Sequence, residues 1–229
     1  MKIKIIRLFF LAFFLFPLNA YQQSFTMSAG LLTDLGGAAP WVGLGNATSS
    51  NNVYVTCALA AGWCSNEVHA TNFGFAIPAG ATIDGIDFVL ERRASANASL
   101  AMSGGVLKAG VQTPAGCVEP NGYWTNIDTY LGCDNFCSFL WSDTWTDADI
   151  NNPLFGITFS VCNSAGGART AFVDHIQITV CYTGGALPLE LLGFNASCLN
   201  NESIKLRWST ATETNNDFFT VERSSDGIN

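Results

Sequence analysis

The stretch Ile86-Asp-Phe-Val-Leu-Glu-Arg-Arg93 decides the fold class, because its apolar residues recur mainly at every second position. In an extended chain, the side chains of Ile86, Phe88 and Leu90 then share one face. A period of two is typical of a strand with one buried face, whereas an amphipathic helix has a period near 3.6. This segment is therefore predicted to be a half-buried β-strand.

The same alternation returns at 155–161 and 176–182, and clusters of Gly, Asn and Ser such as 163–167 mark turns between strands. A single turn of helix is indicated near 146–150, where Thr146 is placed to cap it. We therefore predict an all-β fold. It consists of an antiparallel β-sandwich or jelly roll, followed by an incomplete immunoglobulin/fibronectin-like sandwich.

Residues 1–20 have the three zones of a secretory signal peptide: a basic start, an apolar run from Leu8 to Leu18, and a small residue, Ala20, at the end. The run is shorter than the ~20 residues that span a bilayer, so we expect a cleaved signal and no transmembrane segment in the mature chain. Cleavage leaves seven basic and eighteen acidic residues, a net charge of −11. An acidic chain without a Lys/Arg cluster has no electrostatic footprint for nucleic acid.

The composition changes at Gly184-Gly-Ala-Leu-Pro188, where a Gly-Gly step followed by Pro predicts an interdomain linker. Beyond it stand three strand candidates, at 189–194, 204–208 and 218–222. Three strands cannot close a seven-stranded sandwich of roughly 100 residues, so we expect the chain to be a fragment of a longer protein. The predicted parts are a signal peptide (1–20), a β-sandwich domain (21–183), a linker (184–188) and a truncated module (189–229).

The tail carries a specific sequence pattern. It runs Leu187-Pro-Leu-Glu-Leu-Leu-Gly-Phe194, then Ile204-Lys-Leu-Arg-Trp208, and ends with Phe218-Phe-Thr-Val-Glu-Arg-Ser224. The pattern resembles the opening half of the fibronectin type III-like module that precedes the sorting signal in Bacteroidota type IX secretion substrates. This resemblance implies a secreted or outer cell-surface destination, and makes 189–229 a truncated fibronectin type III-like module.

Three segments of the larger part, 70–86, 140–151 and 173–176, resemble an uncharacterised β-sandwich domain of bacterial surface and phage-associated proteins. The resemblance covers most of residues 38–183. No chemistry is assigned to that family, so the resemblance implies fold and location only. This chain differs from the plainer members of that family in its many Cys. They suggest loops that are cross-linked by disulfides outside the cell.

Eight Cys in an exported chain favour disulfides over metal ligands, because the compartment is oxidising. The disulfide candidates are Cys57, Cys64, Cys117, Cys133, Cys137, Cys162 and Cys181. This is an odd number before the linker, so at least one is free, bonded to Cys198 or bonded to another chain. A loop disulfide is predicted among Cys117, Cys133 and Cys137.

Cys162 and Cys181 lie on the polar sides of two predicted strands, but we expect them not to be joined. If these strands form a hairpin about a turn near Gly167, Cys162 lies opposite about residue 172. Cys181 is then some nine residues further along, or about 30 Å. A disulfide requires Cα atoms within roughly 7 Å. Cys162 is therefore predicted to pair with a loop Cys at its own end of the sandwich.

One loop-rich stretch contains four aromatic candidates for ligand contacts: Trp124, Tyr130, Trp141 and Trp145. Exposed rings could stack on the rings of sugars, as they do on other planar or apolar ligands. The alternative is that they pack into the core, where aromatic side chains bury large areas. Core packing is the favoured reading.

The same stretch offers three carboxylates within seven residues as a candidate Ca²⁺ site: Asp143, Asp147 and Asp149. Calcium takes about 6–8 oxygen ligands, and the EF-hand spacing is missing. Hydrogen bonding to backbone at turns and at a helix start is the favoured alternative for these side chains. No other cofactor is predicted.

The step Asp174-His175 suggests a general base, but strand alternation places His175 on a polar, solvated face. The sequence has no nucleophile elbow, no paired zinc-ligand His and no phosphate-binding Gly loop, so we predict no enzymatic activity. The leading function is a secreted or cell-surface, non-catalytic module for adhesion, assembly or glycan recognition, with an extracellular glycan or protein surface as partner. The alternative is an accessory region of a secreted hydrolase whose catalytic domain lies outside this chain.

Overall fold

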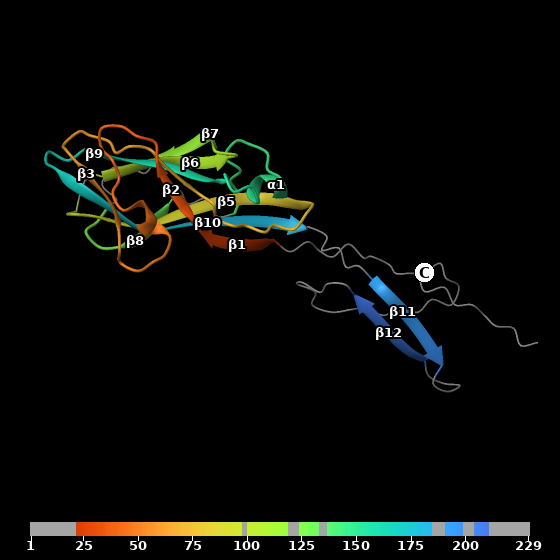
Figure 1. The fold of residues 1–229 in the computed structure, drawn as a ribbon. Coiled ribbons are helices and arrows are strands. Elements are labelled where there is room, and N and C mark those ends of the chain that lie inside the picture. Colours follow the sequence, from red (N-terminus) through yellow and green to blue (C-terminus); the bar gives the residue numbers. More distant parts are fainter. Residues whose placement is uncertain are drawn as a thin grey trace, which may run out of the picture. The chain divides into compact units, whose positions relative to one another are not determined.

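The computed structural model describes residues 22–97, 100–118, 124–132, 137–184, 191–198 and 204–210 (Figure 1). Residues 21–186 form one compact unit and residues 187–229 belong to another. The strands of the larger unit are β1 (Gln23–Ser28), β2 (Leu31–Asp34), β3 (Val55–Leu59), β4 (Val68–Thr71), β5 (Ala81–Ala94), β6 (Leu100–Lys108), β7 (Val111–Val118), β8 (Thr129–Gly132), β9 (Gly156–Asn163) and β10 (Arg169–Gly184). Its helices are η1 (Leu44–Ala47) and α1 (Asp147–Ile150).

Two antiparallel sheets make up the larger unit and form two layers in Figure 1. One sheet has the order β1-β10-β5-β8, with β3 also paired to β10, and the other has the order β2-β4-β9-β6-β7. Successive described strands of this unit alternate between the two sheets, except for the β6–β7 hairpin. This is the connectivity of a jelly roll. The predicted all-β sandwich is therefore confirmed.

The core lies between the two sheets and is built from the alternating residues that predicted the strands. The side chains of Ile86, Phe88 and Leu90 are at most 1% exposed. Apolar residues of β9, including Phe159 and Val161, face them from the other sheet and belong to the same cluster. Burial of such side chains is the main favourable term in folding.

Arg92 breaks the apolar pattern, because it stands in phase with Ile86, Phe88 and Leu90 and is fully buried. Its guanidinium carbon lies 4.6 Å from the ring centroid of Trp124. A guanidinium is planar and more weakly hydrated than an ammonium, so it stacks on aromatic rings at a lower cost than Lys. The charge of Arg92 is thus accommodated at the end of the core.

Strand β10 is the central element of its sheet. It pairs with β5 along one edge, while β3 and β1 follow one another along the opposite edge. The hairpin expected between 155–161 and 176–182 is wrong, because β9 and β10 belong to different sheets. Residues 164–168 cross from one sheet to the other. A period of two fixes which face of a strand is buried, but it does not identify the neighbouring strand.

The predicted helical turn is confirmed as α1. The side chain of its N-cap, Thr146, accepts a hydrogen bond from the backbone N–H of Asp149. The Asp149 side chain in turn accepts from the backbone N–H of Thr146 at 2.9 Å. This reciprocal arrangement is a capping box, which satisfies backbone donors that a helix leaves unpaired at its start.

Two disulfides are described in the larger unit. Cys64 bonds to Cys162 of β9, with Cα atoms 3.9 Å apart, and Cys137 bonds to Cys181 of β10, with Cα atoms 5.3 Å apart. Cys162 and Cys181 therefore pair elsewhere, as predicted, although the hairpin used to predict this does not exist. The segment from Cys137 lies against β5 at Gly85, where an added Cβ would be 2.3 Å from the Cys137 carbonyl carbon.

The other cysteines of the larger unit can be compared with the predicted disulfide pairing. Cys117 is also disulfide-bonded, whereas Cys57 is free and buried. Of the three Cys among which a loop disulfide is predicted, Cys137 bonds to Cys181 instead, because its segment packs on β5 and β10. Cys133 lies outside the described residues. Burial and the nearby charge of Asp34 raise the pKa of the Cys57 thiol to about 11, which leaves it protonated and unreactive.

In the smaller unit, β11 (Leu191–Cys198) and β12 (Ile204–Thr210) form an antiparallel pair. They correspond to the strands expected at 189–194 and 204–208. The third expected strand, 218–222, lies outside the described residues. Across the described parts of the chain, none of the helices has both the length and the apolar character needed to cross a lipid bilayer.

Candidate functional site

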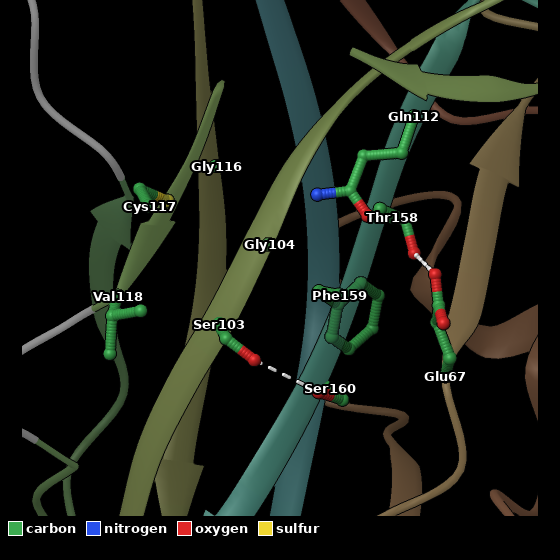
Figure 2. A pocket seen from close by; sticks show the side chains of 10 residues that line it. All are labelled: Glu67, Ser103, Gly104, Gln112, Gly116, Cys117, Val118, Thr158, Phe159 and Ser160. Atoms are coloured by element: carbon green, nitrogen blue, oxygen red, sulfur yellow. Dashed lines mark hydrogen bonds between the residues drawn. The ribbon is translucent and has the colours of Figure 1, made fainter. Parts of the chain in front are cut away.

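A shallow pocket of about 360 Å³ opens on the sheet formed by β2, β4, β9, β6 and β7 (Figure 2). Ser103, Thr158 and Ser160 alternate with core residues along β6 and β9, so they point away from the core. The pocket therefore lies on the outer face of this sheet. Its polar side chains are Glu67, Ser103, Gln112, Thr158 and Ser160.

Four of the five polar side chains of the pocket are paired by hydrogen bonds. The Thr158 hydroxyl donates to the Glu67 carboxylate, as the dashed line in Figure 2 shows. The hydroxyl oxygens of Ser103 and Ser160, which are register partners on β6 and β9, lie 3.0 Å apart. His69 Nε2 lies 3.7 Å from the Glu67 carboxylate. Both contacts reach the same carboxylate oxygen of Glu67, Oε1, and about half of the Glu67 side chain stays exposed.

Two glycines make room for Gln112 over the sheet. An added Cβ at Gly105 would lie 2.9 Å from the Gln112 Nε2, and one at Gly116 would lie 3.3 Å from the same atom. Larger residues at either position would force the amide to move. In Figure 2 the Gln112 amide accordingly lies across β6 toward the pocket.

These groups can offer hydrogen bonds to a ligand. A carboxylate accepts, an amide both donates and accepts, and hydroxyls do either. The pocket holds one carboxylate and no Lys, Arg or His among its lining residues. It therefore lacks the pair of carboxylates that glycoside hydrolysis uses and the nucleophile–base pair of acyl transfer.

A second polar cluster surrounds His175, which is 8% exposed and not solvated as predicted. Its Nε2 lies 2.8 Å from the Ser28 hydroxyl, and its Nδ1 lies 3.5 Å from the Tyr130 hydroxyl. The Tyr130 hydroxyl donates to Glu91 at 2.7 Å. Alternation from His175 to Val180 is intact, but Ser28, Tyr130 and the bridge from Thr48 cover His175 on the outer face of β10.

Asp174 does not orient His175 as a catalytic partner would. Its carboxylate is buried and accepts hydrogen bonds from the backbone N–H groups of Asn51, Asn52 and Val53, at 3.0–3.1 Å. Burial lowers the pKa of His175, against the raising effect of the Glu91 and Asp174 charges. The Ser28–His175 pair resembles a nucleophile with its base, but neither described pocket is lined by these residues. The arrangement ties β1, β8 and β10 together.

The aromatic candidates do not gather into one exposed surface. Trp124, Trp141 and Trp145 are buried, and Tyr130 alone is about half exposed. Trp141 stacks on Phe88 and donates from Nε1 to the Ile86 carbonyl at 2.7 Å. The burial of the three Trp rings agrees with the core-packing alternative.

The acidic candidates are used in local structure. Asp149 completes the capping box, and Asp143 accepts from the backbone N–H of Thr144 at 2.7 Å. Asp147 accepts from the backbone N–H of Gly80 at 3.3 Å. Burial alone would raise the pKa of Asp149, but hydrogen bonds from Thr146 and the charge of Lys108 outweigh it and leave the pKa below its usual value. Within the described ranges, no cluster of three or more His, Cys, Asp or Glu could hold a metal ion.

Sequence reasoning missed the pocket, because its residues are common ones on separate segments. One signal was available in β9, where Thr158 and Ser160 alternate with Ile157, Phe159 and Val161. That pattern places hydroxyls on the outer face. It does not show that Glu67 and Gln112, which come from distant parts of the chain, meet them there.

Comparison of the chain with known protein families, with curated proteins and with solved structures finds no match.

Proposed function

We propose that this chain is a non-catalytic module that works outside the cell, secreted or held at the outer surface, in adhesion or assembly. The observation that carries the proposal is the pocket on the outer face of β4, β9, β6 and β7. It presents hydrogen-bonding groups, and its lining residues include neither a second carboxylate nor a His or Lys base. Such a site suits the binding of a partner rather than its chemical conversion.

Two further observations support the extracellular part of the proposal. The larger unit contains disulfides at Cys64–Cys162 and Cys137–Cys181. Disulfides persist in oxidising compartments and are rare in the cytosol. The signal-like sequence at 1–20 and the fibronectin type III-like pattern of 189–229 agree with export. Together they support a modular surface protein in which the jelly roll carries the binding site.

The proposal is tested by binding of the full chain, purified in oxidised form, to arrayed glycans and to immobilised extracellular proteins. We expect binding that Gln112→Ala weakens. The matched control is Gln177→Ala, which changes the same residue type on the outer face of the other sheet. Hydrolysis of any bound glycan or peptide by the purified chain would contradict a non-catalytic role.

A further inference from the structure

The side chains that line the pocket of the proposed function also limit the chemical class of its ligand. Its lining contains the carboxylate of Glu67 and no cationic side chain. The mature chain expected after cleavage has a net charge of −11. An anionic ligand would therefore enter a site that offers no counter-charge and lies in a negative field. Sialylated, sulfated and phosphorylated ligands are disfavoured on this ground.

A cation fits the pocket equally poorly. Calcium requires about 6–8 oxygen ligands, commonly from several carboxylates, and the pocket has one carboxylate. One oxygen of that carboxylate, Oε1, already accepts from Thr158. An organic cation would gain from an aromatic face, but the ring of Phe159 points into the core and is 1% exposed. The remaining class is a neutral, polar ligand.

The hydrogen-bonding groups of the pocket favour a ligand rich in hydroxyl groups. The second carboxylate oxygen of Glu67 has no hydrogen bond from the described residues, so a ligand hydroxyl can donate to it. The Gln112 amide, which is also without a hydrogen bond from the described residues, can donate to a neighbouring ligand hydroxyl and accept from another. The paired hydroxyls of Ser103 and Ser160 have further hydrogen-bonding capacity.

The volume of the pocket and the residue at its margin agree with a neutral ligand that is rich in hydroxyl groups. A volume of about 360 Å³ lies near the lower end of the ~300–1,000 Å³ typical of small-molecule sites. Val118, at the margin, is 76% exposed and offers an apolar patch for the C–H face of a ring. A short neutral saccharide, such as the end of a glycan chain, matches both.

We propose that the pocket binds a neutral saccharide, with Glu67 accepting from one of its hydroxyls and Gln112 bonding an adjacent one. This inference rests on the proposed function as a binding module. It makes Glu67 and Gln112 the residues that determine specificity. The Thr158 hydroxyl and the His69 ring position Glu67.

The test uses the full oxidised chain and an array of neutral, sialylated and sulfated glycans, followed by calorimetric titration of the best neutral one. We expect neutral glycans to bind. Glu67→Gln keeps the size of the side chain and removes its charge, so it should weaken binding roughly tenfold, as should Gln112→Ala. Gln177→Ala should leave the Kd unchanged, and the thermal midpoints of all three variants should match the wild type.

The outcomes separate the two proposals. Binding of an anionic glycan or a protein that is weakened by Gln112→Ala overturns the neutral-saccharide inference and leaves the binding module standing. Binding of a neutral glycan that neither pocket variant weakens overturns the assignment of this pocket. If a variant lowers the thermal midpoint, Ser103→Ala, which removes a single hydroxyl, replaces it in the same comparison. Absence of binding to every glycan and every protein tested overturns both proposals.

Discussion

Thr146 and His175 show how single side chains hold the described structure together. Thr146 begins α1 by satisfying backbone donors that would otherwise be unpaired. His175 lies where three strands meet, and burial lowers its pKa. Both roles depend on hydrogen bonds that a single substitution removes, so each leads to a measurable expectation.

Replacing Thr146 by Ala should lower the free energy of unfolding by about 1 kcal/mol, because the substitution removes the N-cap acceptor and half of the capping box. Urea denaturation of the full chain measures this. The control is Thr144→Ala, which alters an exposed Thr whose hydroxyl makes no described hydrogen bond. Equal effects of the two substitutions would show that the cap contributes nothing beyond local packing.

His175 should make stability depend on pH. Its pKa in the folded state lies below the ordinary value of 6.5, so the unfolded chain binds the proton more tightly. The free energy of unfolding should therefore be highest above about pH 6.5 and should fall as the pH decreases below that value. His175→Gln should flatten this part of the profile. His69→Gln is the matched control, and a profile unchanged by His175→Gln would refute the assignment.

At the scale of strands, the amino-acid sequence predicted which face of a strand is buried, but not which strands are neighbours in a sheet. Alternation placed Ile86, Phe88 and Leu90 in the core correctly, and a capping Thr predicted the helical turn. Alternation did not show that β9 lies between β4 and β6, because any strand with a buried face satisfies the same pattern. Arg92 stands in phase with the apolar residues of its strand, but a charged residue in a core is too uncommon to predict from this phase alone.

The candidate site was the least predictable feature, because it depends on which strands are neighbours. Glu67 precedes β4 and Gln112 belongs to β7, and the two come together only through the order β4-β9-β6-β7. Trp and Asp residues drew attention in the sequence because their chemistry is distinctive. In the structure they serve packing and capping, while common polar residues form the pocket.

The two described disulfides should be found as linked peptides when unreduced protein is digested. We expect Cys64 linked to Cys162 and Cys137 linked to Cys181, because these pairs meet in the folded sheets. A linked Cys162–Cys181 peptide would contradict the placement of β9 and β10 in different sheets. Mass spectrometry before and after reduction distinguishes the two results.

Removing the Cys64–Cys162 bond with the double substitution to Ser should lower the free energy of unfolding by roughly 2–4 kcal/mol, because the bond closes a long loop in the unfolded chain. Thermal and urea unfolding of the oxidised protein measure the loss. Cys57→Ala removes a thiol without breaking a disulfide and serves as the control. A double variant as stable as the control would show that the bond does not limit the unfolded chain.

For the whole molecule, we predict that residues 21–183, exported alone, fold without the rest of the chain. A domain of about 160 residues buries near 70% of its unfolded surface, which is enough for an independent core. The thermal midpoint should match that of the same unit in the full chain. Residues 188–229 expressed alone should be cleaved rapidly by protease, since a two-stranded sheet such as β11–β12 is marginally stable in isolation. Strong protection of that piece would contradict this division.

The pairing of β1 with β10 has a consequence for the export that we propose for this chain. Tyr182 in β10 bonds to Gln23 in β1 across 159 residues, so the sheet cannot close until almost the whole unit has been synthesised. Contacts of such high contact order form slowly. A chain led by its N-terminus through a secretion channel would therefore stay unfolded while it crosses. The sheet would then be completed by the last strand to emerge, where disulfides can form at once.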